Sequence, residues 1–391
     1  MLNIKKLNAI SGVIYDLLPK ESYNVSSELE DCDAYIVRSA DCHSIEFPKD
    51  LAAIARAGAG VNNIPLDKCT EKGIVVFNTP GANANGVKEL VLCAMFMASR
   101  NVVDAVEWAK KLDPADGEIA KQVEKGKKQF VGPELKGKTI GVIGLGAIGI
   151  LVANAAAAIG MKVIGYDPYL SVENAWTISN HTKRVLSLDE LLSESDYVTI
   201  HVPFIKGKTE NYISGAEFSK MKKGAVLLNL ARGGLVKTSS LKEALENGTV
   251  SKYVTDFPDE SVLGLDGVIC IPHLGASTPE SEENCAVMAA QELRSFFETG
   301  SIKNSVNMPE CLVGPIAEST KRITIIHKNA PNMVGQITKE IAEKGSNIAD
   351  MVNKSRGDIA YTVLNIDGDV PADVLDAISK IDGVVRLRVI G

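Results

Sequence analysis

The stretch KTIGVIGLGAIGILVANAAAAIGMKVIGYDP, residues 138–168, decides the fold of the central part of the chain. It carries Gly144, Gly146 and Gly149 in G-x-G-x-x-G spacing, between an apolar run and an alanine-rich segment. A second apolar run then ends in Asp167, 23 positions after Gly144. A strand, a glycine turn, a helix, a second strand and an acid, in this order, predict a βαβ unit that binds a dinucleotide.

Each part of this motif has a physical role. Gly144 permits the tight turn, Gly146 lets the backbone approach a pyrophosphate, and Gly149 lets the helix pack on the sheet. The helix N-terminus adds partial positive charge for the phosphates. Asp167 would accept hydrogen bonds from ribose hydroxyls and repel a 2′-phosphate, and no arginine follows it in DPYLSVEN. The motif therefore predicts NAD, not NADP; the alternative is a purely structural strand–glycine–helix turn.

The segments after residue 138 alternate between apolar runs and helix-like stretches. The runs are nearly continuous and show no in-out alternation; they span residues 139–144, 161–167, 196–203, 224–231, 251–257 and 267–272. This pattern indicates a parallel sheet covered by helices on both faces. Short apolar runs also mark the first hundred residues, and residues 87–100 form a strongly apolar helix.

The last block, from about residue 321, has a different order of elements. Its pattern reads strand, helix, strand, strand, helix, strand over about 70 residues, which predicts a ferredoxin-like fold. Residues 307–320 form the linker before it. Nothing in this block resembles a catalytic constellation.

Composition limits the classes of function. The net charge of −7 gives no general attraction for nucleic acid or anionic lipid. No apolar run approaches the roughly 20 residues of a membrane span, and the start lacks a secretory pattern. The seven cysteines are odd in number and lack C-x-x-C spacing, which indicates reduced thiols and no zinc site. We therefore expect a soluble cytoplasmic protein without a metal.

Three ionisable residues lie at or just after the ends of later strands: Arg232 in NLARGG, Glu260 in DFPDE and His273 in IPHLG. The carboxyl ends of parallel strands converge on one crevice, so these side chains are candidates for one site. Histidine suits removal of a hydroxyl proton, a neighbouring carboxylate would orient it, and arginine would hold a substrate carboxylate. The alternative is a buried structural histidine, a solvated glutamate and an arginine that caps a helix.

These motifs together resemble one family. GVIGLGAIG, YDPY, HVP followed by Thr209, NLARGG, FPDE and PHLGAST match the D-isomer-specific 2-hydroxyacid dehydrogenases in order and spacing. The resemblance covers essentially the whole chain and is strongest to members that oxidise 3-phospho-D-glycerate. It implies that Arg232, Glu260 and His273 are catalytic. The residues implied to line the NAD site are Gly144, Gly146, Ala147, Ile148, Gly149, Asp167, Thr209, Leu230, Ala231, Arg232, Asp256, His273, Gly275 and Ala276.

The family fold implies two Rossmann-like, doubly wound domains. Residues 1–98 and 285–306 would form a discontinuous substrate domain, and residues 99–284 the NAD domain, with substrate in the crevice between them. Backbone N–H groups of Gly58, Ala59, Gly60 and Val61 would bind the substrate carboxylate. Arg38, Ser39, Asn83 and Arg56 would approach its phosphate; the alternative for Arg38 and Arg56 is that they are ordinary surface cations. Asp256 is displaced by one position against the family aspartate, and NTPGANANG departs from the commoner family pattern around Asn83.

Residues 321–391 resemble an ACT domain, a module that often binds amino acids between paired copies. His327, Asn329 and Asn347 match positions that bind serine in regulated relatives; the alternative is an assembly domain without an effector. The resemblance further implies a homodimer or homotetramer. Two other functions stay open: a dehydrogenase for another D-2-hydroxy acid, such as hydroxypyruvate or glyoxylate, and an NAD-sensing protein like the dehydrogenase-related corepressors.

Overall fold

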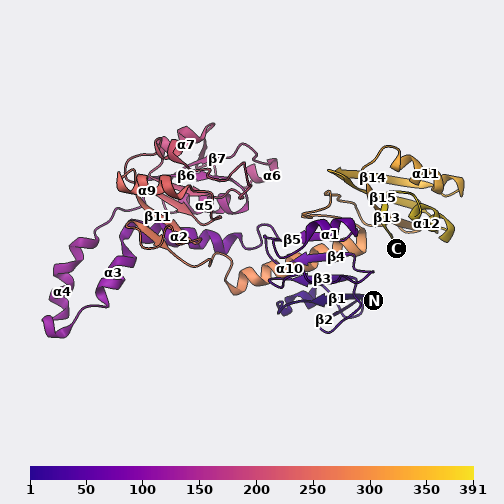
Figure 1. The fold of residues 1–391 in the computed structure, drawn as a ribbon, viewed down its shortest axis with the longest axis horizontal. Helices are drawn as coiled ribbons and strands as arrows, with labels where there is room; N and C mark the ends of the chain where they lie inside the picture. The colour runs from indigo at the N-terminus through magenta and orange to yellow at the C-terminus, as the bar shows by residue number, and fades with distance from the viewer. The chain divides into compact units, whose positions relative to one another are not determined.

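The computed structural model describes all residues, 1–391, and its contacts divide the chain into two units. The first unit comprises Met1–Ala82 and Glu282–Gly391, and the second comprises Asn83–Ser281 (Figure 1). No helix combines the length and the apolar character that crossing a membrane requires.

The first unit contains a five-stranded parallel sheet in the order β2-β1-β3-β4-β5. Its strands are β1 (Leu2–Lys6), β2 (Tyr23–Ser26), β3 (Ala34–Val37), β4 (Ala53–Arg56) and β5 (Val75–Asn78). Its helices are η1 (Gly12–Asp16), α1 (Leu66–Glu71) and α10 (Pro279–Thr299). This strand order is one of the common doubly wound orders, as we expected. The helices are fewer than expected, because the β3–β4 connection covers the sheet with Cys42, Phe47 and Leu51 in a loop.

The second unit contains a seven-stranded parallel sheet in the order β12-β11-β10-β9-β6-β7-β8. Its strands are β6 (Thr139–Ile143), β7 (Lys162–Tyr166), β8 (Thr182–Arg184), β9 (Tyr197–Ile200), β10 (Ala225–Asn229), β11 (Val250–Thr255) and β12 (Val268–Cys270). The order reverses between β6 and β9, which is the point where Rossmann folds bind dinucleotides.

Helices cover both faces of this sheet and explain why its strands are apolar throughout. They are α2 (Ala84–Arg100), α5 (Ala147–Ala158), α6 (Val172–Ala175), α7 (Leu188–Glu194), α8 (Gly215–Phe218) and α9 (Thr238–Glu246). One core contains side chains of α2 and α5, and the other contains side chains of α7, α8 and α9.

Helix α2 corrects the expected domain boundary at residue 98. Its buried side chains, among them Val91 and Met95, pack in the same core as strand β6 and helix α5. The contacts therefore place α2 with the second unit, and the chain crosses between units at Ala82. On the return, the crossing lies at Ser281, close to the expected residue 284.

An arm leaves the second unit after α2. It consists of α3 (Val102–Ala109), η2 (Pro114–Asp116), α4 (Ile119–Gly126) and η3 (Lys127–Phe130). Figure 1 shows α3 and α4 side by side, projecting away from the β11 end of their sheet. Neither helix contains a buried residue. The Trp108 and Phe130 rings, 5.4 Å apart, hold the two limbs of the arm together.

The C-terminal block has the predicted ferredoxin-like order. Its antiparallel sheet runs β14-β15-β13-β16 and carries two helices. The elements are β13 (Thr320–Lys328), α11 (Met333–Glu343), β14 (Ile348–Arg356), β15 (Ile359–Asp367), α12 (Ala372–Ser379) and β16 (Val384–Ile390). Ile337 and Ile341 of α11 are buried in its core, so one face of the helix packs on the sheet.

Buried contacts connect this block to the rest of the first unit. Arg322 donates hydrogen bonds to the carbonyls of Thr299 and Gly314, and the Tyr361 hydroxyl donates to the Gly300 carbonyl at 2.7 Å. The Arg388 guanidinium lies 4.2 Å from the Phe296 ring centroid, a cation–π contact with α10. These buried contacts explain why both parts belong to one unit.

Candidate active site

The glycine turn after β6 has the geometry that the sequence motif predicts. Gly144 has a φ of +87°, and a Cβ there would lie 2.6 Å from the His201 carbonyl oxygen. A Cβ on Gly149 would lie 1.9 Å from the Gly144 carbonyl oxygen. A Cβ on Gly146 would meet no atom within 4 Å. The first and third glycines are thus needed for the turn and the helix packing, and the second faces open space that a phosphate can approach.

A cavity of about 690 Å³ opens at this turn, at the carboxyl ends of β6, β7 and β9. Gly144, Gly146, Asp167 and Thr209, four of the residues implied for NAD, line it. The Thr209 hydroxyl donates to the Pro203 carbonyl and accepts from the Ile205 N–H, so it also shapes the loop after β9. The volume suits part of a dinucleotide, and the wall carries the glycine turn and the acid that such a ligand requires.

Asp167 fixes the loops on both sides of this cavity. Its Oδ2 accepts the Leu145 backbone N–H at 2.8 Å, and its Oδ1 accepts the Tyr169 N–H at 2.7 Å. Each carboxylate oxygen retains a free lone pair, because one oxygen accepts about two bonds. Asp167 therefore holds the glycine turn in place and still offers acceptors to ribose hydroxyls.

Sequence reasoning missed His201 in this wall. The residue is half-buried; its Nε2 lies 2.9 Å from the Thr199 hydroxyl, and its Nδ1 is buried without a partner. Burial lowers the pKa of His201 to about 4, so the ring is neutral near pH 7. An orphaned ring nitrogen in the wall can bond a ligand. Its position in the sequence could have identified it, because His201 directly follows strand β9 as Asp167 follows β7.

The candidate catalytic residues Arg232 and His273 are brought together around Phe257. The guanidinium carbon of Arg232 lies 5.7 Å from the Phe257 ring centroid, and the His273 ring centroid lies 4.4 Å from it. Partial burial is the main cause that lowers the pKa of His273 below its ordinary value of 6.5, and the positive charge of Arg232 lowers it further. A neutral imidazole beside a cation can accept a proton at neutral pH.

Glu260 does not join this pair. It is exposed and forms no hydrogen bond or ion pair, and the pKa of His273 is lowered instead of raised as a neighbouring carboxylate would do. The reason is local: Glu260 lies in the turn that follows Pro258, where Asp259 accepts hydrogen bonds from Ser261. The expected contact between Glu260 and His273 is absent here.

Asp256 lies directly after β11 and next to Phe257 in sequence. It is 2% exposed, and its Oδ1 has no hydrogen-bond partner. Burial raises the pKa of Asp256 to about 6, and the Arg232 charge partly offsets this. A buried unpartnered carboxyl oxygen is costly unless a ligand donor satisfies it. Asp256 therefore fits the place implied for it in the NAD site.

Asn229, which sequence reasoning missed, fixes the turn that carries Arg232. Its Nδ2 donates to the Arg232 carbonyl at 2.9 Å, and its Oδ1 accepts the Ala231 N–H at 3.3 Å. Leu230 is buried in the core beneath this turn. Ala147 and Ile148 open α5, and Gly275 is buried where a Cβ would lie 3.0 Å from Val87.

The residues implied for the substrate belong to the first unit, apart from Asn83 and Arg232. One side chain positions two of them: Asn8 Oδ1 accepts the backbone N–H groups of Arg38, Ser39 and Ala40 at 3.0–3.1 Å. The Arg38 guanidinium lies 2.6 Å from Glu282. Asn83 precedes α2 without a side-chain cap bond.

The Gly58–Val61 turn is fixed by its neighbours. Gly58 has a φ of +146°, which favours glycine, and its carbonyl accepts the Thr79 N–H at 3.1 Å. Asn78 donates to the Ala59 carbonyl at 2.7 Å. The last residue of β5 and the residue after it therefore hold the turn in place.

The three residues expected to bind serine already have partners within the chain. His327 is 2% exposed, with Nδ1 2.8 Å from the Lys328 carbonyl and Nε2 2.8 Å from the Thr362 hydroxyl. Asn329 donates to the Gly357 carbonyl, and Asn347 donates to Asp367. His327 therefore serves as a hydrogen-bonded core residue in this structure, and an effector would need to displace one of its bonds.

Comparison with known proteins identifies the family. Residues 92–275 match the model of the D-isomer specific 2-hydroxyacid dehydrogenase, NAD binding domain. The D-3-phosphoglycerate dehydrogenase of Haemophilus influenzae is 33% identical over 357 residues, which cover 88% of this chain and 83% of that one. The chain belongs to the D-isomer-specific 2-hydroxyacid dehydrogenases. It therefore carries the NAD-binding domain of that family, and all of the matched residues lie in the second unit.

Other members extend the comparison. The D-3-phosphoglycerate dehydrogenase of Archaeoglobus fulgidus is 37% identical over 292 residues, which cover 72% of this chain but only 53% of that one. This chain thus spans about half the length of that relative. The crystal structure of 3-phosphoglycerate dehydrogenase with bound NAD⁺ from Entamoeba histolytica is 28% identical, with a TM-score of 0.60. The aligned residues cover 78% of this chain and 98% of the Entamoeba histolytica chain.

Proposed function

We propose that the protein is an NAD-dependent dehydrogenase that oxidises 3-phospho-D-glycerate to 3-phosphohydroxypyruvate, the first step of L-serine biosynthesis. The observation that carries the proposal is the pairing of Arg232 and His273 around Phe257, next to the unpartnered Asp256. The names of the matched relatives support the substrate.

The residues would act as follows. NAD, when bound, supplies the acceptor for the hydride that leaves C2 of the substrate. Neutral His273 takes the proton of the C2 hydroxyl, so that oxidation releases one proton and one hydride. Arg232 binds the substrate carboxylate and polarises the forming carbonyl. Asp256 would accept a hydrogen bond from an amide donor of the cofactor. Glu260 is exposed and does not contact His273 in this structure, so its proposed role as the partner of His273 requires its side chain to move toward the ring.

The same proposal assigns substrate recognition to the first unit. N–H groups of Gly58–Val61 would bind the carboxylate, and Arg38 with Ser39 would bind the phosphate. The ion pair between Arg38 and Glu282 supports this assignment, since it shows that the Arg38 guanidinium can hold an oxyanion. The phosphate would have to replace the Glu282 carboxylate on Arg38.

We extend the proposal to assembly, regulation and location. The arm exposes Val102, Val103, Val106, Ile119 and Val123, which supports a homodimer or tetramer in which the arm packs on a second copy. The ferredoxin-like topology of residues 321–391 supports an ACT domain, and we assign serine as its effector. Isothermal calorimetry tests the effector. If serine does not bind at millimolar concentration, serine is not the effector of this domain. All seven cysteines are free, which supports a reducing compartment such as the cytoplasm.

A substrate panel tests the function. We expect kcat/KM for 3-phospho-D-glycerate with NAD to exceed that for D-glycerate and D-lactate by roughly a hundredfold or more, because Arg38 pairs with the phosphate. Higher activity on an unphosphorylated acid would favour another D-2-hydroxyacid dehydrogenase. NAD binding without NADH production from any acid would favour an NAD-sensing protein.

A further inference from the structure

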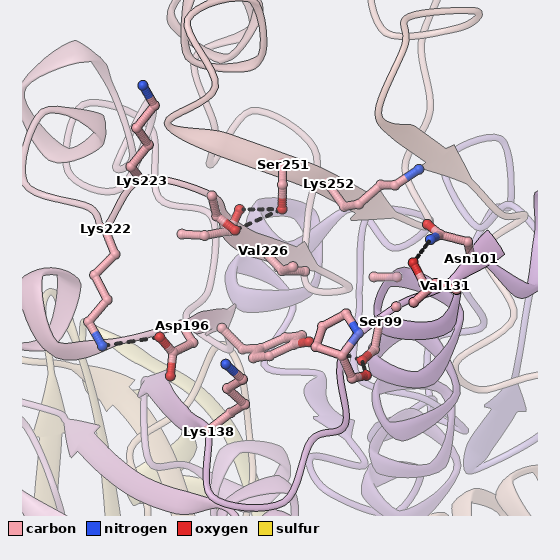
Figure 2. Close-up of a pocket in the computed structure, with 16 residues that line it drawn as sticks. Ser99, Asn101, Val131, Lys138, Asp196, Lys222, Lys223, Val226, Ser251 and Lys252 are labelled. Atoms are coloured by element: carbon pink, nitrogen blue, oxygen red, sulfur yellow. Dashed lines mark hydrogen bonds and ion pairs between the residues drawn. The ribbon is translucent and has the colours of Figure 1, made fainter. Parts of the chain in front are cut away.

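A lysine-rich pocket lies in the second unit, at the amino ends of β6, β9, β10 and β11 (Figure 2). Its volume is about 330 Å³, which is the size of a small ligand site. The glycine turn, Arg232 and His273 follow the carboxyl ends of strands in the same sheet. The pocket lies at the amino ends of the strands and the dinucleotide site at their carboxyl ends. The two sites are therefore separate.

The pocket carries an excess of positive charge. Lys138, Lys222, Lys223 and Lys252 line it, and Asp196 is the one acidic residue in its wall. In a chain with a net charge of −7, such a cluster is a local exception. Like charges that gather around a hollow repel one another unless an anion lies between them.

The acid in the wall leaves much of this charge unpaired. Asp196 Oδ1 lies 3.1 Å from Lys222 Nζ, and its Oδ2 accepts the Thr139 N–H at 2.8 Å. Lys252 makes only a 3.5 Å ion pair with Asp104 of the arm. Lys138 and Lys223 form no ion pair, and in Figure 2 no dashed line reaches either side chain. Two ammonium groups are therefore available to a ligand.

The remaining wall is the base of the arm. Asn101, which has a φ of 48°, separates α2 from α3 and donates to the Val131 carbonyl at 3.4 Å. Ser99 donates to the Pro133 carbonyl at 2.7 Å. A Cβ on Gly132 would lie 1.9 Å from the Ser99 carbonyl oxygen, so the chain leaving the sheet and the chain returning to it are in close contact. A ligand in this pocket contacts both.

We propose that this pocket binds a small anion with two or more negative charges, a phosphate ester or a polycarboxylate, and thereby stabilises the base of the arm. Lys138 and Lys223 provide the main charge contacts. The flexible four-carbon stems of the lysines let their ammonium groups converge on the anion. The inference does not depend on the substrate proposed above, because none of these residues belongs to that site.

Calorimetry with the full chain tests the proposal, at low ionic strength in phosphate-free buffer and with saturating NADH so that the dinucleotide site is filled. Pyrophosphate and citrate are the probes. The pocket variant is Lys138→Gln/Lys223→Gln. The control variant, Lys20→Gln/Lys242→Gln, removes the same charge from lysines that lie outside both this pocket and the dinucleotide cavity and form no ion pair.

We expect the dissociation constant to rise roughly tenfold or more in the pocket variant and to stay unchanged in the control variant. In the wild-type chain, the probe should also slow acetylation of Lys138 and Lys223 but not of Lys242, as measured by mass spectrometry. Binding of pyrophosphate alone supports a phosphate ester, binding of citrate alone supports a polycarboxylate, and binding of both supports recognition by charge. Absence of binding at about 10 mM, or equal binding by the pocket variant, overturns the proposal.

Discussion

The imidazole of His273 packs on the ring of Phe257, with centroids 4.4 Å apart and the ring planes at 45°. Arg232 contacts the same ring. One aromatic side chain thus orients both groups of the proposed proton-transfer and carboxylate-binding site. The three residues lie on separate stretches of the second unit, each just after a strand.

Replacing His273 by asparagine should lower kcat for 3-phospho-D-glycerate by about 10²- to 10⁴-fold, because the proton acceptor is lost. The dissociation constant of NADH should change little, since the glycine turn and Asp167 are untouched. Steady-state kinetics and a fluorescence titration measure the two quantities. A variant that keeps its kcat would exclude His273 as the base.

The acidic limb of kcat/KM should have a midpoint below pH 6.5. Burial and then the Arg232 charge lower the pKa of His273, so the neutral, proton-accepting form is lost only at more acidic pH. Phe257→Leu reduces the burial and should raise this midpoint toward about 6.5. A pH profile that is the same in both proteins would mean that Phe257 does not position the titrating group.

Asp167→Ala should raise KM for NAD roughly tenfold or more and lower KM for NADP. The change removes both the acceptor for ribose hydroxyls and the charge that repels a 2′-phosphate. Asp167→Asn is the matched control, because its amide oxygen can still accept the Leu145 N–H. Unchanged preference for NAD in the alanine variant would argue against Asp167 as the selective residue.

Glu292→Gln should stabilise the folded state above pH 7. Glu292 is 6% exposed, its Oε1 accepts from Asn304, and burial raises its pKa to about 8. An acid with a raised folded pKa loses stability as pH rises from its unfolded value of 4.5 toward 8, because the unfolded chain ionises first. The loss at pH 7 is about 3 kcal/mol.

Urea unfolding at pH 5, 7 and 8 measures this effect. The wild-type protein should lose stability across the series more steeply than Glu292→Gln. Exposed Glu283→Gln serves as the charge control and should follow the wild type. Parallel curves for all three proteins would show that Glu292 is not a buried neutral acid.

Val102→Asp/Val106→Asp should shift the protein toward the monomer without lowering its unfolding midpoint. Both valines are more than 40% exposed on α3, so the aspartates meet solvent in the single chain but a desolvated surface in the assembly. Light scattering coupled to gel filtration gives the mass. An unchanged oligomer would place the interface elsewhere.

The sequence predicted the second unit well because its signals are local. The strand, glycine turn and helix around Gly144–Gly149 each follow from neighbouring residues, and the apolar runs at 196–203 and 224–231 lie where β9 and β10 are found. The same holds for the C-terminal block, where the apolar spacing of α11 and its flanking strands decided the topology.

Contacts between residues far apart in the sequence could not be predicted from local patterns. The role of Phe257 depends on where three separate loops end, and Glu260 matched a motif although its side chain lies in solvent. His327 likewise fitted an effector pattern, but its two ring nitrogens bond the Lys328 carbonyl and the Thr362 hydroxyl. The attachment of the C-terminal sheet to α10 through Arg388 arises from a cation–π contact that has no local pattern.

A crystal structure with NAD and a slowly reacting analogue of 3-phospho-D-glycerate tests the central claim most directly. We predict that a His273 ring nitrogen lies about 2.6–3.2 Å from the C2 hydroxyl, with Arg232 on the adjacent carboxylate. A complex in which the C2 hydroxyl contacts another ionisable group, with His273 turned away from it, would contradict the account.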